Sequence, residues 1–256
     1  MTERLKVDEI SKSFGGVQAT QEVSFSVREG EVLGIIGPNG AGKTTLFNLL
    51  TGIYRVDEGN ILLDGCSIIG KSPREISRLG ISRTFQNIRL FKELTVLENV
   101  MVPFEAEQGY NIFECMLHTG NFRKKQQQAR NYAMELLEAV GIEEFAEKKP
   151  KELPYGHQRK LEIARALVLG KKVLLLDEPT SGMNPVETEQ TLETIQKIRD
   201  RFHISILIIE HHMGVVMNLC TNILVLDFGK QIAYGKPESV KNDPAVIEAY
   251  LGREDD

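Results

Sequence analysis

The stretch Gly37-Pro38-Asn39-Gly40-Ala41-Gly42-Lys43-Thr44 decides the fold, because it has the form of a phosphate-binding loop. It lies between an apolar run at 32–36 and a helical pattern that begins at Thr44. The glycines let the backbone curl so that N–H groups point at phosphate oxygens, and the N-terminus of the next helix adds its positive end. Lys43 can reach the outer phosphates, Thr44 can place its hydroxyl on Mg²⁺, and Thr45 extends the site. The sequence therefore predicts binding of a nucleoside triphosphate with Mg²⁺.

Composition limits the other possibilities. The chain has 256 residues and is 41% hydrophobic, enough for one large α/β domain or a domain that carries an inserted subdomain. Its net charge of −5 gives no general attraction for polyanions, so nucleic acid is not an expected partner. No signal pattern or bilayer-spanning apolar stretch is evident, and we expect a cytosolic chain. Cys66, Cys115 and Cys220 are isolated, so we assign them no metal or redox role.

The chain divides into three stretches. The first, up to about residue 86, holds short β-rich runs separated by Gly-containing turns, which predict antiparallel strands around the loop. The second, 87–152, is dominated by helical periodicity and predicts an inserted helical subdomain. The third returns to apolar runs that alternate with helical patterns, as expected for buried parallel strands. Those runs are 173–176, 204–209 and 223–226.

Two adjacent carboxylates follow the apolar run at 173–176. They are Asp177 and Glu178. A buried parallel strand would deliver Asp177 to the edge of the sheet where the phosphate loop opens, so its carboxylate can hold Mg²⁺ through water. Glu178 can then orient or deprotonate the water that attacks the γ-phosphate. The alternative, an acidic turn after the strand, is disfavoured by the phosphate loop upstream.

Further motifs follow in a set order. They are Thr84-Phe85-Gln86, then Leu153-Pro154-Tyr155-Gly156-His157-Gln158 with the helical run 161–167, then Ser181-Gly182-Met183-Asn184-Pro185, and finally Ile209-Glu210-His211. Together with the loop and the strand that ends in two carboxylates, this order resembles the nucleotide-binding subunit of ATP-binding-cassette transporters over essentially the whole chain. The segment 83–99, the Tyr155-Gly156 pair and the ending Tyr250-Leu251-Gly252 resemble the branched-chain amino acid importer branch of that family.

The resemblance implies an α/β P-loop nucleotide-binding domain of the ATP-binding-cassette type over residues 1–256. Such a domain has a RecA-like core, an N-terminal antiparallel β subdomain and an inserted helical subdomain, here 87–152, followed by the signature motif at 153–158. It also implies roles for three more side chains. Phe14 would stack on adenine, Gln86 would sense Mg²⁺ and the attacking water, and His211 would contact the γ-phosphate as a donor.

Two positions depart from the family pattern. The family signature usually reads Leu-Ser-Gly-Gly-Gln, whereas Pro154 and Tyr155 here replace the Ser and the first Gly, and Gly156 remains. Pro154 has neither a hydroxyl nor an N–H, so direct contact with the γ-phosphate is weakened while the positive helix end is kept. Asn184 stands where the family usually has Asp, and its uncharged amide can still accept a hydrogen bond across an interface.

In this family two chains sandwich two ATP molecules, and the signature helix of one subunit caps the γ-phosphate held by the other. The resemblance therefore implies ATP/ADP and Mg²⁺ as ligands, a second ATPase subunit, and transmembrane permease subunits. A heterodimer is favoured over a homodimer because of the altered signature. We expect an ATPase that powers an importer of branched-chain or related amino acids from the inner face of the membrane. An export or lipid-extraction complex and, less favoured, a soluble cassette ATPase stay open as alternatives.

Overall fold

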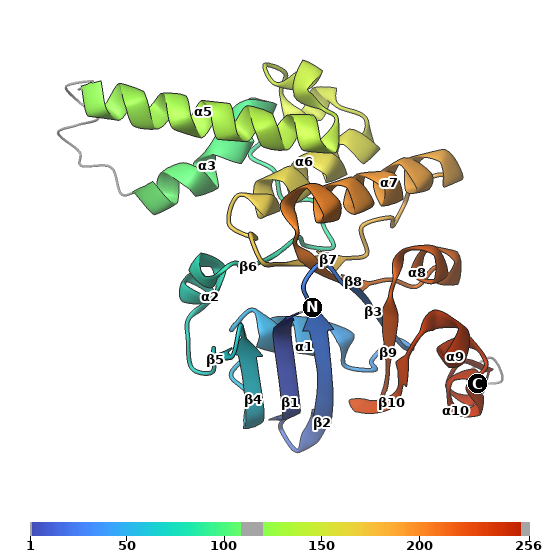
Figure 1. Cartoon of the computed structure of the whole chain (residues 1–256). Coiled ribbons are helices and arrows are strands. Elements are labelled where there is room, and N and C mark those ends of the chain that lie inside the picture. Colours follow the sequence, from blue (N-terminus) through green and yellow to red (C-terminus); the bar gives the residue numbers. More distant parts are fainter. Residues whose placement is uncertain (1, 109–119, 252–256) are drawn as a thin grey trace.

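The computed structural model describes residues 2–108 and 120–251 (Figure 1). Their strands form one 10-stranded sheet in the order β5-β4-β1-β2-β10-β9-β3-β8-β7-β6. In the centre, β3 (Val32–Ile36) lies between β9 (Asn222–Asp227) and β8 (Ser205–Ile209), and β7 (Val173–Asp177) and β6 (Ile81–Arg83) continue outward from β8. All of these neighbours pair in parallel. The buried parallel strands predicted from the apolar runs are confirmed.

The other half of the sheet is mainly antiparallel. It contains β1 (Glu3–Phe14), β2 (Val17–Arg28), β4 (Glu58–Leu63), β5 (Cys66–Ser67) and β10 (Lys230–Gly235). β1 pairs with both β2 and β4 in antiparallel register, as the β-rich runs before residue 86 predict. These strands curl around α1 (Lys43–Leu50), the helix that follows the phosphate loop (Figure 1).

Alternating side chains of the parallel strands build two cores. In β8, Ile206 and Ile208 pack into one hydrophobic cluster and Leu207 into the other, because successive side chains of a strand point to opposite faces. The first cluster is covered by helices α5 (Gly120–Val140), α6 (Tyr155–Leu167), α7 (Pro185–Phe202) and α8 (Met213–Leu219). The second encloses α1 and the antiparallel strands. Burial on both faces explains why these strands are apolar throughout.

The helices gather mostly on one side of the molecule. α3 (Val96–Gln108), α5 (Gly120–Val140) and α6 (Tyr155–Leu167) form a group at the top of Figure 1, and α7 (Pro185–Phe202) lies below it. Short 3-10 turns at Glu143–Phe145 and Pro150–Glu152 join α5 to α6. The remaining helices are α2 (Pro73–Leu79), α8 (Met213–Leu219), α9 (Pro237–Lys241) and α10 (Pro244–Leu251). No helix within the two described ranges is long and apolar enough to span a bilayer.

This architecture confirms the expected fold class, with a parallel core, an N-terminal antiparallel part and a group of inserted helices. The connection between α3 and α5 includes Cys115 and lies outside the described residues. The carboxyl ends of β3, β7 and β8 meet at one edge, which brings together the segments that follow them. That edge carries the phosphate loop, the two carboxylates and His211.

Candidate functional site

The phosphate loop is shaped by two glycines that no other residue could replace without strain. Gly37 has φ +147°, and a Cβ there would lie 2.0 Å from the carbonyl oxygen of Leu226. Gly42 has φ +100°, and a Cβ there would lie 2.4 Å from the carbonyl oxygen of Ala19. Both values lie in the left-handed range that favours glycine. The curl of the loop therefore depends on close approach to β9 and β2.

Lys43 lies inside this curl. Its side chain is largely buried, and its Nζ donates to the carbonyl oxygens of Gly37 at 2.6 Å and Pro38 at 2.8 Å. Lys43 is the first residue of α1, and its ammonium is held within the loop by these two carbonyls. A cation in this place can act on the outer phosphates of a bound nucleotide.

A polar cavity of about 450 Å³ opens in front of the loop. It contains the loop residues from Asn39 to Thr45 together with Gln86, Asp177, Glu178 and His211, all expected at the site from the sequence. Four further lining residues did not stand out in the sequence, and they are Val17, Gln18, Ala19 and Phe228. The last lining residue, Ile209, belongs to the quoted Ile209-Glu210-His211 motif. The other expected residues do not line this cavity, and they are Gly37, Pro38, Phe14, Pro154, Tyr155, Gly156 and Asn184.

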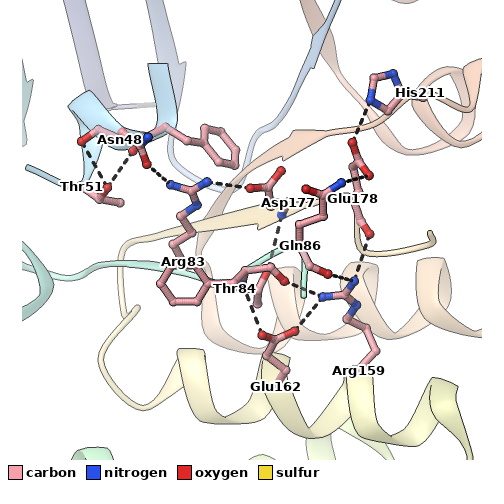
Figure 2. Close-up of polar contacts among 12 residues, drawn as sticks. Asn48, Thr51, Arg83, Thr84, Gln86, Arg159, Glu162, Asp177, Glu178 and His211 are labelled. Carbon is pink, nitrogen blue, oxygen red and sulfur yellow. Dashed lines mark hydrogen bonds and ion pairs between the residues drawn. The ribbon is translucent and has the colours of Figure 1, made fainter. Parts of the chain in front are cut away.

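Glu178 is at the centre of a three-residue network in the cavity (Figure 2). Its Oε2 accepts a hydrogen bond from Nε2 of Gln86 at 2.8 Å, and its Oε1 lies 2.8 Å from Nε2 of His211. Since the Gln86 NH₂ group faces Glu178, its amide oxygen is available for a metal ion or a water molecule. The arrangement gives one carboxylate two partners that fix its direction, as a group that orients water requires.

Asp177 is held differently. Its Oδ2 pairs with Nη2 of Arg83 at 2.6 Å, and both side chains are only 8% exposed. Arg83 also donates from Nη1 to Oδ1 of Asn48 in α1, and its guanidinium lies near the rings of Phe47 and Phe85. This buried cation, at the end of β6, links the strand of Asp177 to the helix that follows the phosphate loop.

The residues present fit Mg²⁺. The Thr44 hydroxyl, the Gln86 amide oxygen and the Asp177 carboxylate line one cavity and are hard oxygen donors. The pairing of Asp177 with Arg83 uses Oδ2, which leaves Oδ1 for a metal-bound water. Few protein ligands and several waters are typical of Mg²⁺ beside phosphates.

Phe14 lies at the end of β1, where its ring is 42% exposed and packs edge-on against Tyr54 with 5.0 Å between centroids. Nζ of Lys12 lies 5.3 Å from the same ring. One face of an exposed aromatic ring can receive a purine base. Tyr54, which the sequence did not single out, supports the edge of that ring.

The signature segment begins α6. Pro154 is the N-cap, and its carbonyl accepts from the N–H groups of His157 and Gln158. The N–H groups of Tyr155 and Gly156 have no intrahelical acceptor at this position, so they can face an anion. Pro154 thus stands directly before the first helical residue, Tyr155, and the helix end expected from the sequence is kept.

Asn184 has a local partner rather than a free amide. Its Oδ1 accepts from the N–H of Glu187 at 3.0 Å, and a Glu187 carboxylate oxygen accepts from the N–H of Asn184 at 3.1 Å, which forms a capping box at the start of α7. Asn is among the best N-cap residues. An amide that accepts a bond across an interface, as expected from the sequence, would have to share this oxygen.

Three charged residues beneath the cavity were missed in the sequence. The side chains of Arg83, Arg159 and Glu162 are buried, and the last two form an ion pair of 2.7 Å within α6 (Figure 2). Arg83 directly precedes Thr84-Phe85-Gln86, which was the available signal. Arg159 and Glu162 stand three residues apart in a helical pattern, and such a pair is usually a solvated i,i+3 contact.

Comparison with known proteins agrees with this geometry. Residues 20–181 match a family model described as ABC transporter, and residues 230–256 match one described as branched-chain amino acid ATP-binding cassette transporter. The chain is 43% identical over 248 residues to the high-affinity branched-chain amino acid transport ATP-binding protein BraF of Pseudomonas aeruginosa, covering 97% of each chain.

Solved structures give the same result. The ADP conformation of an ATP-binding cassette of an ABC transporter is 33% identical, with a TM-score of 0.85 over 99% of this chain and 100% of that one. A dimeric ATP-binding cassette in a post-hydrolysis state, bound to ADP and phosphate, is 26% identical, with a TM-score of 0.74 over 91% of this chain and 98% of that one.

Proposed function

The chain belongs to the ATP-binding-cassette family of transporter subunits, and we propose that it powers the uptake of branched-chain amino acids through partner membrane subunits. Its place in this family makes it an ATP-binding and ATP-hydrolysing subunit. The observation that carries the assignment of the solute is the match to BraF along nearly the whole of both chains. The cassette model alone would not separate amino acid import from other transport.

For the chemical step, Glu178 orients and deprotonates the attacking water. Gln86 and His211 support this role because they hold both of its carboxylate oxygens at 2.8 Å. The phosphate loop from Gly37 to Thr45 binds the phosphates, and Phe14 receives the adenine ring. Thr44, Gln86 and Asp177 hold Mg²⁺, which neutralises charge on the phosphates when it is bound.

The second ATPase subunit completes the site. The start of α6, with the N–H groups of Tyr155 and Gly156, would face the γ-phosphate bound by the partner. Pro154 supplies no donor there, which favours a heterodimer in which the partner carries a stronger signature. The dimeric relative bound to ADP and phosphate supports the general arrangement. The assembly would lie on the cytoplasmic face of the membrane, attached through the permease subunits.

Contact with the permease is proposed at the segment after Gln86. Phe91 is 48% exposed, whereas Leu90 packs partly against the core. The backbone of Phe91 is fixed by the fully buried Asn99, whose Oδ1 accepts from the Phe91 N–H at 2.8 Å and whose Nδ2 donates to its carbonyl at 3.0 Å. An exposed aromatic side chain on an anchored backbone suits contact with another protein.

An apolar cavity of about 240 Å³ lies close to this segment. Ile53, Ile76, Phe85 and Leu169 are among its lining residues, and Arg165 connects it to Phe91, with the guanidinium 5.4 Å from the ring centroid. A short amphipathic helix of a permease would fit a hollow of this kind. Phe85 precedes Gln86 directly, so movement of the segment Thr84-Phe85-Gln86, here called the lid segment, would be transmitted to this surface.

The decisive experiment is reconstitution. The chain, its expected partner ATPase and the neighbouring permease subunits are placed in liposomes with ATP inside and the solute-binding protein outside. We expect ATP-dependent uptake of leucine, isoleucine or valine, and no uptake when ADP replaces ATP. ATP hydrolysis without uptake of any of these, but with uptake of another solute, would contradict the assignment of the cargo and leave the ATPase role intact.

A further inference from the structure

Arg159 is the most deeply buried charged side chain near the cavity. It lies on α6, one turn after Gly156, and is 0% exposed. Its charge is balanced by Glu162, which is 2% exposed and accepts from Nη1 at 2.7 Å. A buried pair of this kind gains little stability, since apolar residues of similar size often serve as well or better. Its presence here calls for another explanation.

The other hydrogen bonds of the Arg159 guanidinium supply that explanation. Nη1 also donates to the carbonyl oxygen of Phe85 at 2.8 Å, and Nη2 donates to the carbonyl oxygens of Gln86 at 3.0 Å and Glu178 at 3.3 Å. Figure 2 shows this side chain reaching from α6 to both segments. All four hydrogens of the two NH₂ groups therefore have an acceptor. Nε, by contrast, is buried with no hydrogen-bond partner in the described part of the chain.

The orphaned Nε matters because an unpaired buried donor is costly. The position of the guanidinium thus satisfies three backbone carbonyls but leaves one of its own donors, Nε, without an acceptor. Those carbonyls belong to the lid segment and to the residue after β7. Two of them are the carbonyls of Gln86 and Glu178, whose side chains bond to each other at 2.8 Å in the cavity, and the third belongs to Phe85, directly before Gln86.

Glu178 needs such support. Its φ is +46°, in the left-handed region that a non-glycine residue rarely adopts, and strain of this kind is kept only where the surroundings enforce it. Its N–H donates to the carbonyl oxygen of Ile209 at 3.0 Å, which fixes one side of the residue to the end of β8. The bond from Arg159 to its carbonyl fixes the other side.

We propose that Arg159 is a positioning residue for ATP hydrolysis. It holds the left-handed backbone of Glu178 and the backbone of Gln86 in a fixed position relative to each other, so that the Glu178 carboxylate stays directed at the attacking water. It does not touch the nucleotide, and it acts through these two residues. The inference rests on the proposed roles of Glu178 and Gln86. Because Arg159 lies on the helix that begins with the signature segment, it also ties those two residues to the position of that helix.

The test uses the full-length chain and two variants. Arg159→Lys keeps a cation beside Glu162, but a single ammonium cannot reproduce a planar fork to three carbonyls. The double variant Arg159→Met with Glu162→Met removes the whole pair without leaving a buried charge, so it is the version expected to fold if the lysine variant does not. Lys160→Met is the matched control, because it removes one positive charge from the next position of α6, where the side chain is half-buried near Glu193 and Lys197.

We expect kcat at saturating ATP to fall about ten- to a hundred-fold in both Arg159 variants, since small misplacement of a reacting group has effects of that order. The Kd for ADP, measured by calorimetry, should stay within about three-fold of the wild type, because the phosphate loop is untouched. The control should keep both values. A residue that only stabilised the fold would lower the melting temperature and weaken both parameters together.

Glu178→Gln is measured in parallel to separate the proposed role of Arg159 from the proposed role of Glu178. If it loses turnover while a folded Arg159 variant keeps kcat within two-fold of the wild type, the positioning role of Arg159 is overturned. A Kd for ADP that rises as much as kcat falls would also overturn it. If Glu178→Gln itself keeps turnover, the proposed role of Glu178 is wrong, and the inference about Arg159 is overturned with it.

Discussion

Asp177 and Glu178 are neighbours in the chain, yet the protein holds them by different physical means. Asp177 ends a regular strand and is paired with the buried cation Arg83 at 2.6 Å. Glu178 has a strained backbone and is surrounded by an amide, an imidazole and the guanidinium that binds its carbonyl. The first environment balances a charge, whereas the second fixes a direction.

The difference suits the two proposed tasks. The charge of a buried carboxylate that meets a metal ion is stabilised by a cation beside it. A carboxylate that activates water must point accurately but keep its basicity, and a close cation would lower that basicity. Changes around Asp177 should therefore appear first in stability and metal dependence, and changes around Glu178 in turnover.

The largest effect is expected for Glu178→Gln. The amide keeps the shape and the contact with His211 but cannot take a proton, so kcat should fall by about a hundred- to ten-thousand-fold, the usual contribution of a general base. Binding of ATP should persist, and gel filtration with ATP should show a trapped dimer, alone or with the partner subunit. Glu248→Gln, at an exposed position of α10, is the control. Normal turnover in the Glu178 variant would remove this residue from the chemistry.

Arg83→Met tests the other side of the comparison. It leaves the Asp177 carboxylate buried without its cation, which costs about 3 kcal/mol and should lower the melting temperature without nucleotide by about 6–12 °C. Saturating Mg-ADP should raise that temperature more than in the wild type, because the metal supplies a replacement charge. Arg130→Met removes an exposed arginine from its 2.8 Å pair with Glu147 and should change little. Equal shifts in the two variants would contradict a special role for Arg83.

The sequence was sufficient for the features that depend on local patterns. The phosphate loop, the apolar parallel strands and the pair Asp177-Glu178 are each contained in a short segment, and so is the lid residue Gln86. The buried guanidiniums were not predictable in the same way. Arg83 and Asp177 meet because β6 pairs with β7, and neither segment by itself predicts that pairing.

The environment of individual side chains is a second feature that the sequence alone did not predict. Arg159 and Glu162 have the spacing of a surface ion pair, and only the packing of α6 under the lid makes them buried. Asn184 was expected to accept a hydrogen bond across an interface, and the capping box at the start of α7 already gives its oxygen a donor within the chain, the N–H of Glu187. For Arg159 and Glu162, the residue types and spacing are compatible with a solvated or a buried ion pair, and the tertiary contacts choose between them.

Phe91→Ala should have a smaller effect on the ATPase site itself. Neither carboxylate contacts Phe91, so ADP binding by the isolated subunit should be nearly unchanged. Assembly with the permease, or stimulation of ATP hydrolysis by it, should weaken, because an exposed aromatic anchor is lost. Ile247→Ala, which truncates a similarly exposed side chain on α10, is the control. Co-purification and uptake at wild-type levels would exclude Phe91 from the coupling surface.

The smallest effect is expected for Pro154→Ser, which changes the signature and leaves both carboxylates in place. Pro154 has φ −54° and ψ 154° at the N-cap of α6, a conformation that serine adopts readily. A serine there adds an N–H and a hydroxyl that can accept from its own helix while its hydrogen points outward to a phosphate. One added hydrogen bond of about 1 kcal/mol would raise kcat of the assembled complex about five-fold.

Pro154→Ala separates the two additions, since it restores the N–H without the hydroxyl. A gain in the serine variant alone would mean that phosphate capping limits the rate and that the geometry around Glu178 is already adequate. A gain in both would assign the effect to the backbone donor. A lower kcat in both, with the melting temperature unchanged, would show that proline fits this site better than a donor does. The network of Gln86, Glu178 and Arg159 would then be the part of the site that sets turnover.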